Sequence, residues 1–174
     1  MKNDVIINRV WAMPNSQTFT IKPIKELLSR YIDNGIWVDP FVRNSIFKDR
    51  MSLTNDLNPE IEATHNLEAL EFLKSIPDES VDGVLFDPPY SFRQIMECYN
   101  GIGRKVFQTD TNGSFYADKK NEIARITKSG GKVISFGWNS MGIGKTRGFK
   151  MVDILLVPHG GSKNDTIVTV EIKA

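Results

Sequence analysis

The sequence has little cysteine, little histidine and no long apolar run. Its 174 residues include one cysteine, Cys98, and two histidines, His65 and His159. A single cysteine excludes an internal disulfide and a zinc site built on several cysteines. The two histidines stand apart from candidate ligands, so we expect no metal site. No apolar stretch approaches the length of a membrane span, and the first ten residues, MKNDVIINRV, lack the apolar core of a signal peptide. We therefore expect a cytoplasmic protein.

The sequence also lacks an excess of either sign of charge. Lysine and arginine total 22 and aspartate and glutamate 21, which gives a formal net charge of +1. The field of the whole molecule therefore does not indicate a nucleic-acid binder, and any site for a polyanion must be a local patch. The length and the apolar content of 40% are typical of one globular unit, so residues 1–174 are expected to form a single domain.

Apolar runs and helical stripes alternate along most of the chain, which predicts an α/β fold with a mainly parallel sheet. The last two apolar runs have only the polar turn GGSKN between them, and so short a connection forces an antiparallel pair. We therefore expect a doubly wound sheet that ends in one antiparallel hairpin. The predicted strands are 36–41, 51–56, 81–86, 132–138, 149–160 and 165–173. The predicted helices are 23–33, 66–76 with Asn66 as its cap, 92–100 with Ser91 as its cap, and 114–127 stopped by two glycines.

Three of the predicted strands end in acidic or amide side chains. These are Asp39, the pair Asn55 and Asp56, and Asp87. In doubly wound sheets, ligands bind beyond the carboxyl ends of the parallel strands. The convergence of several acids at one edge therefore predicts a ligand site there.

The strand 81–86 runs directly into Asp87, Pro88, Pro89 and Tyr90. Proline has no N–H to give to a sheet, so the two prolines end the strand. Proline also favours an extended conformation for the residue before it, which is Asp87. The result is a stiff strand tip that presents a carboxylate, a carbonyl and an aromatic ring.

This DPPY tip resembles the catalytic motif of the S-adenosylmethionine-dependent amino-methyltransferases, particularly the adenine-N6 DNA methyltransferases of phage and bacterial type. The resemblance covers nearly the whole chain, in the unpermuted motif order, and it implies a Rossmann-like methyltransferase sheet. Residues 11–24 are placed like the family's N-terminal cofactor segment, Asp39, Pro40 and Phe41 like its first-strand motif, and residues 54–60 like its second-strand motif. The implied cofactor contacts are Trp11, Asn15, Phe19, Ile21, Asp39, Pro40, Phe41, Asn55, Asp56, Leu57 and Asp87.

The resemblance also implies roles for these residues. Asp87 and the Pro88 carbonyl would accept the two N6 hydrogens of adenine, held rigid by Pro89, and Tyr90 would stack on the base. Asp56 would bind the ribose diol of the cofactor, with Phe41 near the adenosyl group. Asn55 and Leu57 would flank its adenine, and Asp39 would face its ammonium group. A base inside a duplex is out of reach, so the target must be flipped out or single-stranded.

Two basic stretches are candidates for contact with nucleic acid. In the loop 137–148, Trp138 and Asn139 would meet the flipped base, and Lys145 and Arg147 the phosphates. A solvated basic turn explains that loop equally well. The second stretch, with Arg93, Arg104 and Lys105, would line a groove.

Two departures from the family pattern leave alternatives open. Arg43 and Asn44 stand where the family usually has glycine, which lets the backbone approach the cofactor. In addition, no segment is left over for a target-recognition domain. The chain is therefore expected to act on DNA, with a second copy or a separate specificity subunit choosing the target. RNA as the substrate and a catalytically silent binding subunit are the alternatives.

Overall fold

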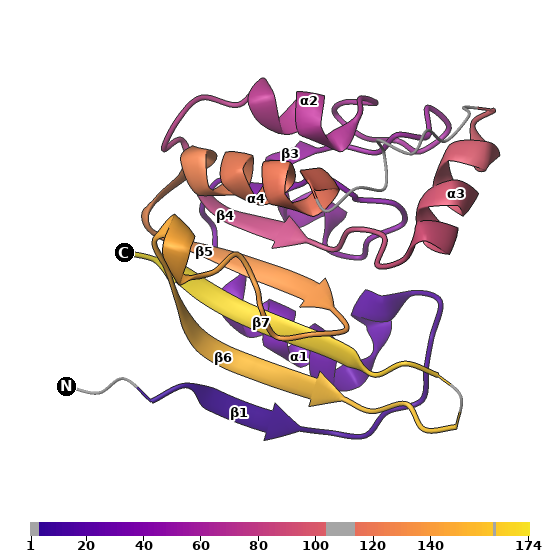
Figure 1. Cartoon of the computed structure of the whole chain (residues 1–174), viewed down its shortest axis with the longest axis vertical. Helices are drawn as coiled ribbons and strands as arrows, with labels where there is room; N and C mark the ends of the chain where they lie inside the picture. Colours follow the sequence, from indigo (N-terminus) through magenta and orange to yellow (C-terminus); the bar gives the residue numbers. More distant parts are fainter. Residues whose placement is uncertain (1–3, 104–113, 162) are drawn as a thin grey trace.

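The computed structural model describes residues 4–103, 114–161 and 163–174, and these form a seven-stranded sheet with helices on both faces (Figure 1). None of the helices described in these ranges is long and apolar enough to cross a membrane. The strands are β1 (Ile6–Arg9), β2 (Trp37–Asp39), β3 (Leu53–Thr54), β4 (Val81–Phe86), β5 (Thr127–Gly137), β6 (Phe149–Val157) and β7 (Thr166–Lys173). The helices are α1 (Lys22–Tyr31), α2 (Ala69–Lys74), α3 (Phe92–Gly101) and α4 (Ser114–Ile126).

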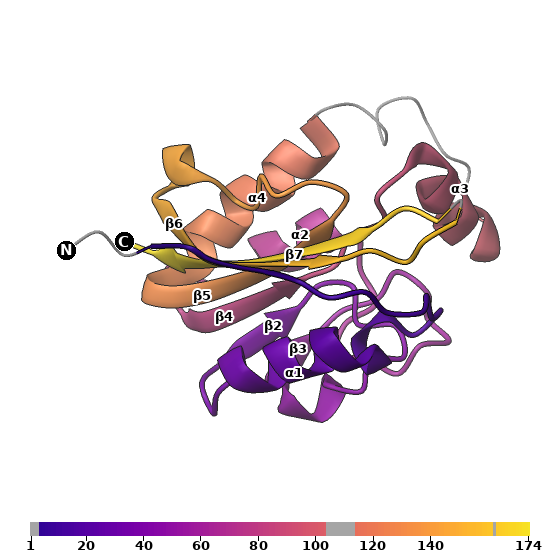
Figure 2. The same ribbon diagram turned by 90° about the horizontal axis from the view of Figure 1, so that it is seen from below.

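The sheet has the order β1-β6-β7-β5-β4-β2-β3. β7 runs antiparallel to both of its neighbours, and the other pairs are parallel. This arrangement confirms the predicted doubly wound sheet with a C-terminal antiparallel hairpin. Figure 2 shows α1 on one face of the sheet and α2 with α4 on the other, while α3 lies beyond the strand ends.

Three local predictions were wrong or incomplete. Strand β1, which pairs with β6 at the sheet edge, was not expected at all. Helix α2 begins at Ala69, because Asn66 caps nothing and instead donates from its amide to the carbonyls of Asp56, Asn58 and Ile61. The two glycines expected to stop α4 lie inside β5, which follows the helix without a loop.

The apolar core is divided between the two faces of the sheet. One cluster packs beneath α1 and includes Leu28, Trp37 and Leu85; the other lies under α2 and α4 and includes Phe72, Val84 and Ile123. All six are fully buried. Since neighbouring residues of a strand face opposite sides, Val84 and Leu85 supply one side chain to each cluster.

Trp37 packs tightly in this core against Gly83, its register partner on β4. A Cβ added to Gly83 would lie 2.5 Å from atoms Cδ2 and Cε2 of the Trp37 ring. We expect Gly83→Ala to lower the free energy of unfolding by about 1–3 kcal/mol, because a fully buried indole cannot move aside. Urea unfolding measures this loss.

The matched control is Gly101→Ala, since a Cβ at Gly101 meets no atom within 4 Å. That variant should be close to neutral in the same measurement. Equal stability of the two variants would contradict the tight packing of Trp37 on β4.

Candidate functional site

Three cavities surround the carboxyl end of β4, and each is lined by a different part of the DPPY tip. Pro89 lines the large cavity, of about 500 Å³. Asp87 lines the small cavity, of about 270 Å³. Pro88 and Tyr90 line a third cavity of about 240 Å³, here called the aromatic pocket. The tip therefore forms a shared wall between spaces large enough for small molecules.

Local bonds fix the tip between β4 and α3. Ser91 caps α3, as predicted, by accepting a hydrogen bond from the backbone N–H of Gln94 at 3.3 Å. The Gln94 side chain reaches back and accepts the N–H of Tyr90 at 2.6 Å. The Tyr116 hydroxyl donates to the carbonyl of Pro89. With two prolines besides, the tip has little freedom to change conformation.

The carboxyl group of Asp87 is half-buried and accepts a hydrogen bond from the Tyr90 hydroxyl through Oδ1. Burial raises the pKa of Asp87 above its usual value, while the Tyr90 hydrogen bond and the Arg43 charge pull it back down. The pKa of Tyr90 is raised well above its usual value by burial and by Asp87, so the phenol stays protonated and remains the donor. Among the described residues, Oδ2 of Asp87 has no hydrogen-bond partner and can accept an N–H.

The large and small cavities meet along the loop that follows β2. Phe41, Arg43 and Asn44 line both of them. Asp56 lines the large cavity and accepts the backbone N–H of Arg43 at 3.0 Å and that of Asn58 at 2.9 Å. Each carboxylate oxygen has a second lone pair, so Asp56 can still accept the hydroxyl groups of a diol.

Asn55 and Leu57 also line the large cavity, but they have different freedom to bind a ligand. The Asn55 amide donates to the carbonyls of Pro40 and Leu67 and accepts the N–H of Leu67. Its polar atoms are thus used to join three loops. Leu57 packs beside Ile95 and Tyr99 of α3 and offers an apolar surface.

Asp39 is the last residue of β2 and has no exposed surface. Its Oδ1 accepts the N–H of Phe41 at 2.9 Å, and its buried Oδ2 has no partner among the described residues. Burial, together with the negative charges of Asp87 and Asp56, raises the pKa of Asp39 to about 8. Asp39 and the buried Pro40 line none of the three cavities. The structure therefore does not bring Asp39 to the position expected for an ammonium contact.

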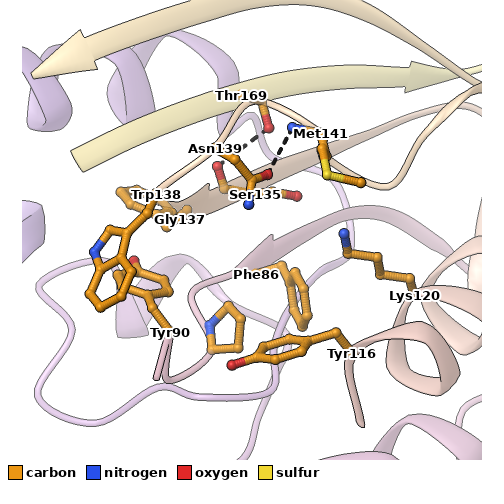
Figure 3. A pocket seen from close by; sticks show the side chains of 13 residues that line it. Phe86, Tyr90, Tyr116, Lys120, Ser135, Gly137, Trp138, Asn139, Met141 and Thr169 are labelled. Carbon is orange, nitrogen blue, oxygen red and sulfur yellow. Dashed lines mark hydrogen bonds between the residues drawn. The ribbon is translucent and has the colours of Figure 1, made fainter. Parts of the chain in front are cut away.

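The aromatic pocket combines a ring-lined wall with polar groups opposite it (Figure 3). The rings of Tyr90 and Trp138 lie 5.8 Å apart at a tilt of 59°, and Tyr116 and Phe86 extend the same wall. Ser135 is nine-tenths buried, and its Oγ has no hydrogen-bond partner in the described part of the chain. The polar groups of the pocket come from Lys120, Ser135, Asn139 and Thr169.

Of this pocket, the sequence indicated only Pro88, Tyr90, Trp138 and Asn139. Tyr116 and Lys120 lie on a helix whose polar face is ordinary, and Thr169 is one of several β-branched residues in β7. Ser135 carried the one usable signal, because it is a hydroxyl residue inside the apolar run KVISFGW. A buried polar side chain in such a run needs a partner, which a ligand can supply.

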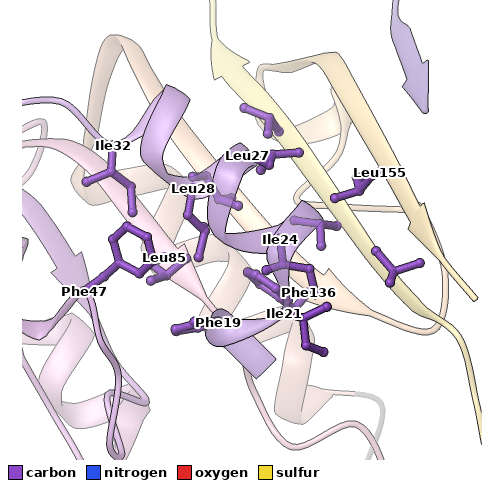
Figure 4. Packing of buried hydrophobic residues seen from close by; sticks show 14 of the residues in the cluster. Phe19, Ile21, Ile24, Leu27, Leu28, Ile32, Phe47, Leu85, Phe136 and Leu155 are labelled. Atoms are coloured by element: carbon purple, nitrogen blue, oxygen red, sulfur yellow. The ribbon is translucent and has the colours of Figure 1, made fainter. Parts of the chain in front are cut away.

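The N-terminal segment reaches the site only in part. Phe19 and Ile21 belong to the core cluster under α1 (Figure 4), and Phe19 also lines the small cavity. Ile21 lines none of the three cavities. Asn15 folds its own turn, with its amide donating to the hydroxyl of Thr20, and Trp11 is exposed next to Gly160. Of the four predicted contacts in this segment, the structure brings only Phe19 to a cavity.

The predicted nucleic-acid contacts are also separated. Lys145 and Arg147 form a turn just before β6, and β6 runs parallel to β5 because both are antiparallel to β7. This turn, at the start of β6, therefore lies at the opposite ends of the strands from Trp138, which follows the end of β5. Arg147 is bonded to the side chain of Asn121 and to the carbonyl of Ile143.

Of the other three basic residues, Arg93 is exposed on α3 and paired with Glu97 at 2.8 Å. Arg104 and Lys105 lie outside the described residues.

Comparisons with known proteins identify the fold but no sequence family. A scan of protein-family models finds no match, and a search of curated protein sequences finds none either. Among solved structures, TrmN from Thermus thermophilus aligns with a TM-score of 0.58 at 16% identity, over 88% of this chain and 49% of TrmN. YhhF from Escherichia coli aligns with a TM-score of 0.55 at 10% identity, over 94% of this chain and 92% of YhhF.

A third structure, the 1,6-didemethyltoxoflavin-N1-methyltransferase of Burkholderia thailandensis, contains its substrate and S-adenosylhomocysteine. It aligns with a TM-score of 0.53 at 12% identity, over 86% of this chain and 76% of the enzyme. The chain therefore has the Rossmann-like fold found in methyltransferases, and it spans about half the length of TrmN.

The raised pKa of Asp39 gives a testable pH dependence. Between its usual pKa of 3.8 and the folded value of about 8, the folded protein holds a proton that the unfolded chain does not. Stability from this group is therefore present at low pH and falls by about 1.4 kcal/mol per pH unit as the pH rises through that window. We expect the wild-type protein to lose stability relative to Asp39→Asn, which does not titrate, between pH 5 and pH 8.

Urea unfolding of both proteins at each pH measures the difference, and the many groups that they share cancel. A difference that stays constant across this range would show that Asp39 is ionised in the folded state.

Proposed function

We propose that this chain binds S-adenosylmethionine in the large and small cavities and transfers its methyl group to an exocyclic amine held in the aromatic pocket. The finer proposal is the N6 amine of adenine in DNA. The observation that carries methyl transfer to an amine is the position of Asp87. This residue lines the small cavity, while Tyr90, which is hydrogen-bonded to it, lines the aromatic pocket. The Asp87 carboxylate thus lines the proposed donor side, and the ring hydrogen-bonded to it lines the proposed acceptor side.

The fold supports methyl transfer as the class of reaction. One of the aligned structures is a methyltransferase that holds S-adenosylhomocysteine, the product left when S-adenosylmethionine gives up its methyl group. The DPPY tip supports an amine as the acceptor, since it offers hydrogen-bond acceptors at a strand end. Residues 1–174 would act as one catalytic unit.

The side chains of the two cofactor cavities fit the proposed ligand. Asp56 can accept the ribose hydroxyl groups through its remaining lone pairs. Leu57, Ile61 and Ile95 supply an apolar surface for a purine ring in the large cavity. The small cavity, lined by residues 16–20, 41–46 and Asp87, would then hold the amino-acid part. When bound, S-adenosylmethionine supplies an electrophilic methyl group.

The residues of the DPPY tip would prepare the amine. Its lone pair is delocalised into the ring, so it is a poor nucleophile until its hydrogens are held. Oδ2 of Asp87 and the carbonyl of Pro88 would accept those two hydrogens and favour a tetrahedral nitrogen. Since the prolines set both acceptors in place beforehand, little reorganisation is needed at the moment of transfer. Most of the acceleration would come from positioning the two reactants.

The aromatic pocket supports a heteroaromatic target. The rings of Tyr90 and Trp138 offer faces on which a base can stack, and stacking contributes about 1–3 kcal/mol per base. The orphaned hydroxyl of Ser135 offers one hydrogen bond to the base edge. An extrahelical base from either DNA or RNA meets these requirements. A second copy of the chain or a separate subunit would contribute to target choice.

The direct test is transfer of label from methyl-tritiated S-adenosylmethionine to DNA that lacks methylated bases. Digestion to nucleosides should give label only in N6-methyldeoxyadenosine. Asp87→Ala should reduce the rate by about 10²–10³ or more, because one preset acceptor is lost. Its unfolding midpoint should stay nearly unchanged.

Other results of the labelling experiment would contradict parts of this proposal. Label in cytosine would refute the adenine assignment, and label in a matched RNA but not in DNA would identify RNA as the substrate. Cofactor binding without any transfer would favour the catalytically silent subunit.

The bond from Tyr90 to Asp87 gives a separate prediction. Tyr90→Phe keeps the ring but removes a hydrogen bond that lowers the pKa of Asp87. The pKa of Asp87 should therefore rise further, and since the ionised form is the acceptor, activity should need a higher pH. We expect the acid limb of the pH–rate profile to shift upward in Tyr90→Phe.

In Tyr90→Ala, the maximal rate should fall as well, because the stacking surface is lost. An unchanged acid limb in Tyr90→Phe would show that Tyr90 does not tune Asp87.

A further inference from the structure

Arg43 stands at the junction of the large and small cavities. It has a positive φ of 43°, a conformation that glycine adopts freely and other residues rarely. Its backbone N–H donates to Oδ2 of Asp56, which holds the loop against the end of β3. The side chain lines both cavities and reaches toward α3, where Nη2 lies 3.5 Å from Sγ of Cys98.

The guanidinium group of Arg43 has acidic neighbours but no close anionic partner. Arg43 as a whole is exposed; partial desolvation of its guanidinium acts to lower the pKa, but the Cys98, Asp87 and Asp56 groups outweigh this effect and raise that pKa. No carboxylate among the described residues lies within ion-pair distance of the guanidinium, and its one side-chain contact is a sulfur, which is a weak acceptor. Arg43 therefore has several donors left for a ligand.

The charges that line the cleft are unequal. Among the described residues, the acids lining the two cavities are Asp56, Glu68, Asp87 and Glu97, and Arg43 is the one cationic side chain. A ligand that carries a carboxylate into this cleft would meet repulsion from every charged lining residue except Arg43.

We infer that Arg43 recognises the carboxylate of the cofactor's amino-acid part and so selects ligands that carry it. The inference rests on the proposed function. With the ribose at Asp56 in the large cavity, the amino-acid part enters the small cavity and passes Arg43 at the junction. The planar guanidinium can hold a carboxylate through two parallel N–H bonds, which a lysine cannot do.

The test compares two ligands in calorimetry on the whole chain. S-adenosylhomocysteine and 5′-methylthioadenosine share the adenosine and the thioether, and only the first has the amino-acid part. The wild-type protein should prefer S-adenosylhomocysteine. Arg43→Gly should lower the affinity for S-adenosylhomocysteine by at least about tenfold, the loss expected for hydrogen bonds to a charged group. The affinity for 5′-methylthioadenosine should not change.

The choice of variant separates the side chain from the loop. Glycine fits a φ of 43° without strain, so Arg43→Gly should keep the loop and should not lower the unfolding midpoint. Arg43→Lys keeps the charge but loses the paired geometry. Its affinity for S-adenosylhomocysteine should lie between that of the wild type and that of Arg43→Gly. Arg9→Met, on β1 at the far edge of the sheet, is the matched control and should bind both ligands like the wild type.

Three results would overturn the inference, and they differ in what else they affect. An unchanged preference in Arg43→Gly would refute the carboxylate contact alone. Tighter binding of both ligands by Arg43→Gly would show that Arg43 shields the cleft from ligands. If the wild-type protein bound neither of these ligands nor S-adenosylmethionine, the proposed function would fail together with this inference.

Discussion

The parallel pairing of β2 with both β3 and β4 is the constraint on which the candidate site depends. Val38 is the register partner of Leu53 on one side and of Val84 on the other. Because these strands run in the same direction, the chain leaves the sheet at the same edge three times, each time next to an acidic residue. Asp39, Asp56 and Asp87 come within electrostatic reach of one another for this reason, although their strands come from separate parts of the chain.

Carboxylates gathered at one edge repel each other, and the structure relieves this repulsion differently for each. Asp56 accepts two backbone N–H groups, and Asp87 accepts the Tyr90 hydroxyl and lies near the Arg43 charge. Asp39 is fully buried and has no ion-pair partner among the described residues, so its pKa rises to about 8 and it holds a proton near neutral pH. The edge therefore carries less negative charge than its sequence indicates.

The aromatic pocket depends on register in a similar way. Phe86 of β4 pairs with Ser135 of β5, and Ser135 pairs with Thr169 of β7, so one row across the sheet forms part of the pocket. Tyr116 and Lys120 of α4 join this row because α4 covers that face of the sheet. No spacing in the sequence links these residues, since their neighbourhood exists only after the strands have paired.

The sequence by itself determined the succession of helices and strands along the chain. Apolar runs, prolines and glycines predicted most of these elements, the C-terminal hairpin and the acids at the strand ends. These features follow from local periodicity and from the missing N–H of proline, which act over a few residues. Only the tertiary structure decided which of the expected contacts line a cavity. It buried Asp39 and Ile21, placed Lys145 at the far edge, and put Arg43 in the cleft in a backbone conformation that glycine usually adopts. Burial and orientation depend on packing between elements distant in sequence, and no local pattern carries that information.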